Sequence, residues 1–121
     1  MTTEQLLRSV MDRWKAGIDA REPDRVAALF STDAVFQGLR PYTVGRTGVA
    51  TYYDSQPLGM TVDYRVLETR RPTNDVVLGY LAATFAFTDR PPLELNIGVV
   101  LTDGGDGWHV AQYQAASSGR V

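Results

Sequence analysis

The stretch DVVLGYLAATFAFTDRPPLELNIGVVLTDGGDGWHVAQYQAASS, residues 75–118, decides how the rest of the chain is arranged. Residues 76–88 are apolar and rich in β-branched and aromatic side chains, which is typical of a strand. Asp89-Arg90-Pro91-Pro92 interrupts this run, because proline cannot donate to a central ladder. Residues 93–102 then alternate between apolar and polar or small side chains, which predicts a strand with one buried face. Asp103-Gly104-Gly105-Asp106-Gly107 has the composition of a hairpin turn, and residues 108–118 predict a third strand.

The first of these strands is apolar on both of its faces. Val77, Leu81 and Phe85 share one parity, whereas Leu78 and Tyr80 lie on the other. In an antiparallel sheet, this pattern predicts a core on one face and a protein interface on the other.

The last strand leaves two arrangements open. Without a bulge, Gln112 and Gln114 share a face with Trp108 and point into the interior, where buried amides would contact a ligand or water. A single bulge would move both glutamines to the surface, because one extra residue exchanges the two faces downstream of it.

The chain before residue 75 supplies the helices that cover this sheet. Thr2 and Gln5 form a capping-box pattern, and apolar residues then recur at helical spacing to about Ala20. The later segments predict a short helix starting at Pro23, a strand over 34–37, a loop over 38–45, a third helix over 48–55 and a strand over 60–70. This order predicts an α+β fold with the helices on one side of an antiparallel sheet.

Composition limits the classes of function. With 121 residues, the chain is expected to form one domain over residues 1–121. The net charge of −2 argues against nucleic acid or an anionic membrane as partner. The absence of cysteine and the single histidine argue against zinc, and we expect no metal or cofactor. The sequence has no long apolar run and no signal-peptide pattern, so the expected location is the cytoplasm.

Three segments carry a family resemblance: VAALFSTDAVF at 26–36, VGRTGV at 44–49 and GWHV at 107–110. In this order, they resemble the nuclear transport factor 2-like superfamily, and within it the SnoaL-like and ketosteroid-isomerase-like proteins. The resemblance covers essentially the whole chain. It implies a cone-shaped, bent sheet wrapped around N-terminal helices, an apolar cavity, and a homodimer formed through the outer sheet face.

The residues that steroid isomerases use for proton transfer are mostly missing. The resemblance places their oxyanion-stabilising tyrosine at Trp14, their base carboxylate at Gly38 and their second acid near Ile97 or Gly98. None of these residues can transfer the proton or donate the hydrogen bond that the reaction needs. Only the supporting tyrosine of the third helix is matched, at Tyr53. The sequence therefore argues against steroid isomerase chemistry and leaves open whether the chain is an enzyme.

Four side chains are candidates for a catalytic role. Tyr53 and Gln112 would polarise a ligand carbonyl, although Tyr53 is equally consistent with a core tyrosine. His109 is the one side chain expected to titrate near neutrality, but its parity favours the outer face and no carboxylate partner is evident. Asp33 is the best-placed carboxylate, although aspartate at a strand start is usually a cap or turn residue. The expected pocket residues are Trp14, Phe36, Tyr53, Tyr64, Gln112 and Gln114.

Three functions are consistent with these observations. The leading one is binding of a small apolar, aromatic or polyketide-like molecule in the cone; the reaction class, if there is catalysis, is proton transfer or cyclisation of a carbonyl compound. The second is a non-catalytic ligand carrier that uses the same pocket. The third is a dimeric protein-interaction module whose interior is filled by its own side chains, which predicts no ligand-sized cavity.

Overall fold

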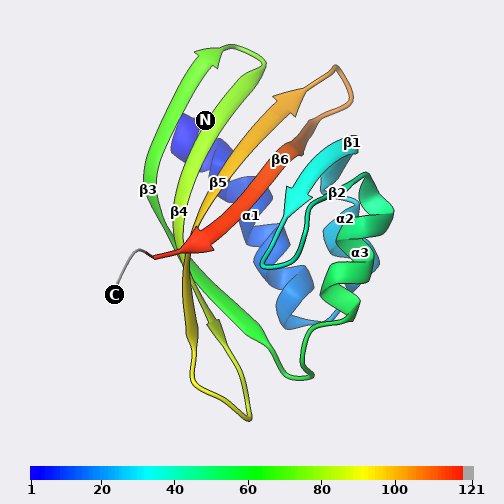
Figure 1. The fold of residues 1–121 in the computed structure, drawn as a ribbon. Coiled ribbons are helices and arrows are strands. Elements are labelled where there is room, and N and C mark those ends of the chain that lie inside the picture. Colours follow the sequence, from blue (N-terminus) through cyan, green and yellow to red (C-terminus); the bar gives the residue numbers. More distant parts are fainter. Residues whose placement is uncertain (119–121) are drawn as a thin grey trace.

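The computed structural model describes residues 1–118, in which a single bent sheet has helices packed on one face (Figure 1). This confirms the expected α+β fold. The helices are α1 Thr3–Asp19, α2 Pro23–Ala27 and α3 Arg46–Asp54; the strands are β1 Phe30–Gln37, β2 Thr43–Val44, β3 Thr61–Thr73, β4 Val76–Ala86, β5 Leu93–Asp103 and β6 Trp108–Ser117.

The strand order is β2-β1-β6-β5-β4-β3. The strands from β3 to β6 pair as consecutive antiparallel neighbours, as the sequence predicts. β1 pairs with β6 in parallel, with Phe36 opposite Tyr113, so the sheet is mixed. β2 is a two-residue strand inside the expected loop, and it pairs antiparallel with β1.

α1 packs across the face of the sheet that we call the helix face. Thr2 and Gln5 exchange the two hydrogen bonds of a capping box at its start. Its apolar stripe lies against the sheet, and the close approach to β4 depends on Gly79, because a Cβ there would lie 2.8 Å from both methyl groups of Leu7. Among residues 1–118, no helix is long and apolar enough to cross a lipid bilayer.

α1 also covers part of the free edge of β3. The Lys15 ammonium donates to the carbonyl oxygen of Val62 at 2.7 Å, and the Val62 N–H donates to Asp19 Oδ1 at 3.0 Å. Lys15 and Asp19 form an ion pair at 2.7 Å, so one turn of helix satisfies both backbone groups of an edge residue.

A bulge in β6 decides which face each later side chain takes. Val100 pairs with Gln112 and Leu101 pairs with Val110, so Ala111 is the extra residue. Gln112 and Gln114 consequently lie exposed on the opposite, outer face of the sheet. Their expected position inside the cone is wrong, and the bulged alternative is the one that the structure shows.

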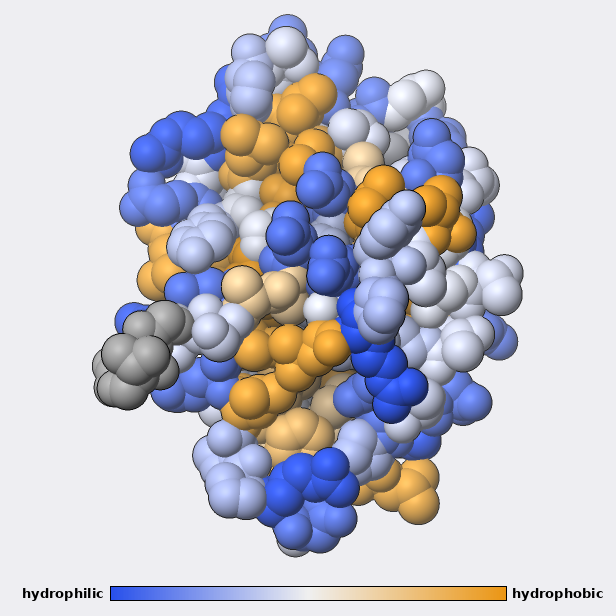
Figure 2. All heavy atoms as spheres, in the orientation of Figure 1, coloured by the Kyte–Doolittle hydropathy of each residue, from blue (hydrophilic) through white to orange (hydrophobic). Residues whose placement is uncertain are grey.

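The two-sided character of β4 is confirmed. Val77, Leu81 and Phe85 are buried on the helix face. Leu78 and Tyr80 remain 38 % and 43 % exposed on the outer face. Figure 2 views this outer face and shows apolar patches separated by polar side chains.

Candidate functional site

An aromatic cluster fills the space between the helices and the sheet. Phe36 of β1 stacks on Tyr113 of β6 with ring centroids 4.8 Å apart. The ring centroids of Trp14 and Tyr113 lie 6.1 Å apart, and those of Tyr53 and Phe36 lie 5.7 Å apart. None of these four side chains is more than 4 % exposed. The structure therefore brings Trp14, Phe36 and Tyr53 together, as the sequence suggests.

The sequence analysis missed Tyr113 as a member of this cluster. The bulge at Ala111 turns Tyr113 inward in place of the two neighbouring glutamines. The signal was the spacing of apolar residues along β6: Val110 and Tyr113 are three residues apart, which a regular two-residue period does not give.

The polar groups of the cluster bond to one another. Trp14 Nε1–H donates to the Tyr53 hydroxyl oxygen at 3.0 Å, and the Tyr113 hydroxyl also hydrogen-bonds to Tyr53. Burial raises the pKa of Tyr53 above the ordinary value of tyrosine, and the hydrogen bonds from Tyr113 and Trp14 only partly oppose this shift. Burial likewise raises the pKa of Tyr113. Both phenols are therefore neutral at physiological pH, and neither is suited to act as a general base.

Two hollows on the Met60 side of this cluster are small. One lies beside Tyr53 and Met60, near the junction of α1 and α2, and has a volume of about 10 Å³. The other lies at the mouth of the cone, beside Tyr52, Phe87 and Leu93, and has a volume of about 30 Å³. A pocket for a drug-sized ligand has roughly 300 Å³ or more, whereas a water molecule needs only about 10–15 Å³. These hollows can hold water and are far too small for such a ligand.

The other candidate residues are dispersed. Tyr64 lies against α1, where its hydroxyl donates to Asp12 at 2.5 Å, and burial together with Asp12 raises its pKa. Asp33 is exposed on β1, and His109 is half-buried opposite Thr102. Among residues 1–118, no three acidic or histidine side chains are grouped so that they could hold a metal ion. Catalytic roles for Tyr53, Gln112, Asp33 and His109 stay predictions.

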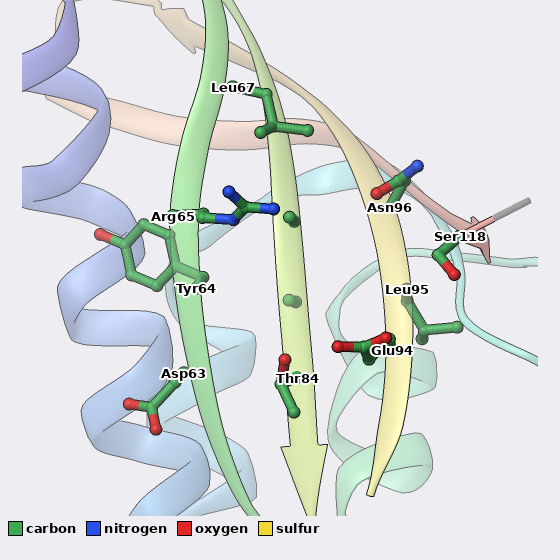
Figure 3. A pocket seen from close by; sticks show the side chains of 11 residues that line it. Asp63, Tyr64, Arg65, Leu67, Thr84, Glu94, Leu95, Asn96 and Ser118 are labelled. Carbon is green, nitrogen blue, oxygen red and sulfur yellow. The ribbon is translucent and has the colours of Figure 1, made fainter. Parts of the chain in front are cut away.

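Two larger hollows lie on the outer face of the sheet. One has a volume of about 400 Å³ and is lined by Leu78, Tyr80, Gln112 and Gln114 among others. The second, of about 380 Å³, crosses β3, β4 and β5 (Figure 3).

The second hollow has an uncharged floor on β4 between Arg65 and Glu94, and its third charged residue, Asp63, pairs with Lys15 at 3.1 Å. Arg65 of β3 pairs with Ala82 of β4, and Glu94 of β5 pairs with Thr84 of β4. Figure 3 shows the Arg65 and Glu94 side chains pointing toward β4 from opposite sides. Within residues 1–118, neither Arg65 nor Glu94 forms an ion pair.

The architecture matches that of known structures. A ketosteroid isomerase-like protein from Erwinia carotovora atroseptica superimposes with a TM-score of 0.82 over 96 % of this chain and 96 % of its own, at 20 % sequence identity. The chain has the nuclear transport factor 2-like fold. This confirms the fold that the resemblance of the sequence motifs implied.

Other neighbours with this fold differ in their descriptions. A domain of unknown function with a cystatin-like fold from Nostoc punctiforme has a TM-score of 0.86 at 16 % identity, covering 98 % of this chain and 79 % of its own. A putative scytalone dehydratase from Novosphingobium aromaticivorans has a TM-score of 0.77 at 14 % identity, covering 98 % and 94 %. No protein-family model and no curated protein matches the sequence. At these identities the likeness shows the fold and transfers no activity.

Proposed function

We propose that the protein functions as a dimeric, non-catalytic interaction module, and that the outer face of the sheet is its binding surface. The observation that carries this proposal is the contrast between the two faces. The interior is filled by Trp14, Tyr53, Tyr113 and their neighbours, whereas hollows of about 400 and 380 Å³ lie on the outer face. The partner in this proposal is a second copy of the chain.

Apolar side chains on the outer face favour burial against such a partner. Leu78 and Tyr80 of β4 are 38 % and 43 % exposed, and Val35 and Val44 extend the apolar surface onto β1 and β2. Extended exposed apolar surface on a folded protein usually marks an interaction site, because its removal from water is favourable.

The charges on this face are self-complementary, because a basic side chain of one protomer can meet an acidic side chain of a second copy. A two-fold axis running along β4 would place β3 of one protomer over β5 of the other. Arg65 lies at the level of Ala82 and Glu94 at the level of Thr84, so the partner's Glu94 would lie two residues along the strand from Arg65, within reach of its long side chain. The same pair would form a second time by symmetry, and Asp63, which also lies at the level of Thr84, is paired with Lys15 of its own protomer. The uncharged side chains of β4 would pack between the two ion pairs.

Charge reversal tests this arrangement. Each single variant, Arg65→Glu or Glu94→Arg, would bring like charges together twice and should be monomeric in sedimentation velocity at a concentration where the unmodified protein is dimeric. A mixture of the two variants should dimerise, because each protomer then meets an opposite charge on the other. Arg13→Glu, on the exposed side of α1, is the matched control and should leave the dimer intact.

The mixing step separates contacts between protomers from contacts within one. If the mixture stays monomeric although both variants are folded, the Arg65–Glu94 arrangement is wrong. If the unmodified protein is itself monomeric at high concentration, the module proposal fails as a whole.

Binding of a small apolar molecule in the cone, which the resemblance implies, would require the aromatic cluster to open. A thermal-shift screen with small carbonyl compounds, steroids and polycyclic phenols distinguishes this function from ours. A specific ligand at about a hundred times its dissociation constant would stabilise the fold by roughly 2.7 kcal/mol. Our proposal predicts no shift that depends on Tyr53, and a clear shift that Tyr53→Phe abolishes would replace it.

A further inference from the structure

A hollow of about 280 Å³ lies outside the cone, between α3 and the loop that joins β1 to β2. One of its walls is formed by Gly48, Thr51, Tyr52 and Ser55. Their spacing of three, four and seven residues places them along one side of α3. The facing wall is formed by residues 40–43. We call this hollow the α3 pocket.

The lining of the α3 pocket is largely apolar and aromatic. Phe36 is only 2 % exposed, and the ring of Tyr52 meets it edge to face with centroids 5.0 Å apart. Pro41 adds a rigid apolar ring on the loop side. Such walls favour a flat apolar group, because its burial removes apolar area from water.

Two polar groups of the α3 pocket lack partners. The hydroxyl oxygen of Thr43 is buried and has no hydrogen-bond partner among residues 1–118. Buried polar atoms are nearly always paired in folded proteins, so this hydroxyl indicates a missing water or ligand. Arg40 is exposed and forms no ion pair within residues 1–118, and no acidic side chain lines the pocket.

Gly48 preserves the position of the Thr43 hydroxyl. A Cβ at residue 48 would collide with that oxygen. The α3 backbone can therefore pass close to Thr43 only because residue 48 has no side chain.

We infer that the α3 pocket binds a small aromatic monocarboxylate, with its ring between Tyr52 and Pro41, its carboxylate on Arg40 and a hydrogen bond from the Thr43 hydroxyl. The planar guanidinium of arginine suits a planar carboxylate, with which it can form two parallel hydrogen bonds. The volume suits one ring rather than a polycyclic ligand. This inference does not depend on the proposed dimer, since it involves a different surface.

The test is an NMR titration of the ¹⁵N-labelled protein with benzoate, and with benzamide as its uncharged counterpart. Benzoate should shift the amide signals of residues 43–52 saturably, and benzamide should bind roughly tenfold more weakly or less, because it lacks the charge that Arg40 recognises. Arg40→Gln should weaken benzoate binding roughly tenfold or more. The exposed Arg13 of α1 provides the control, and Arg13→Gln should leave the affinity unchanged.

Thr43→Val separates the ligand from a bound water. Valine keeps the shape of threonine and removes the hydroxyl, so it should weaken benzoate binding several-fold and should raise the melting temperature of the ligand-free protein. If Thr43→Val raises that temperature but benzoate shifts no signal, the hydroxyl holds only a water and the inference is wrong. Equal affinities for benzoate and benzamide, or equal losses in Arg40→Gln and Arg13→Gln, would also overturn it.

Discussion

The hydroxyl of Tyr53 accepts a hydrogen bond from the indole of Trp14 deep inside the helix face of the sheet. Tyr53→Phe would leave the Trp14 N–H buried without this acceptor, which should cost about 1–3 kcal/mol of unfolding free energy. Urea denaturation measures this loss.

Tyr52→Phe is the matched control for this substitution. The Tyr52 hydroxyl accepts only a long bond, 3.4 Å, from the Leu39 N–H, and its ring packs on Phe36 without it. We expect a change within about 0.5 kcal/mol. Equal costs for the two substitutions would contradict the importance of the Trp14–Tyr53 bond.

For single residues, the sequence predicted which side chains are buried better than it predicted what those side chains do. Trp14, Phe36 and Tyr53 could be assigned to the interior because helical and strand periodicity report burial. Whether an interior lined by such residues is hollow depends on how their rings interlock. Periodicity carries no information on that packing.

The contact between α1 and β4 depends on Gly79. Gly79→Ala would place a methyl group 2.8 Å from Leu7 and 3.0 Å from Val99, so α1 would have to move away. We expect a loss of about 1–3 kcal/mol of unfolding free energy, measured by urea denaturation in the Arg65→Glu background to keep the chain monomeric.

Gly98→Ala in the same background is the control, because a Cβ at Gly98 meets nothing within 4 Å. Its stability should stay level or rise by about 0.4–1 kcal/mol through restriction of the unfolded chain. A similar loss in both variants would show that glycine in the sheet, rather than the approach of α1, causes the effect.

The strands show where sequence patterns stop being sufficient. β4 and β5 carry a strict two-residue period, so their faces could be assigned before the structure was known. In β6 one extra residue, Ala111, exchanges the faces, and the sequence allowed both arrangements. The parallel pairing of β1 with β6 was also not predicted, since periodicity reports which face is buried and not which strand lies beside it.

The whole molecule should lose stability in alkaline solution. Tyr53 and Tyr113 have pKa values raised by burial above the ordinary value of 10.0, so in the folded state they keep their protons. In the unfolded chain, both ionise near pH 10. The stability that they contribute is therefore fully present below about pH 10 and falls above it, by about 1.4 kcal/mol per pH unit for each phenol.

Urea midpoints measured from about pH 9 to about pH 11 should show this decline. The slope should be shallower in Tyr53→Phe, which removes one of the phenols whose pKa is raised. Tyrosinate absorbance from both residues should appear together with the loss of tertiary structure. Ionisation of both phenols in a protein that is still folded would contradict the assignment.

The hydrogen bonds that Lys15 and Asp19 make to the backbone of Val62 also affect how readily the protein aggregates. An uncovered strand edge is a template onto which other chains can add, as in amyloid growth. The end of α1 prevents this at Val62 by taking the place of a neighbouring strand. Fraying of that helix end would uncover the template while most of the fold remained intact. Storage lifetime would then follow the local unfolding of one helical turn, and a variant with unchanged melting temperature could still form fibrils sooner.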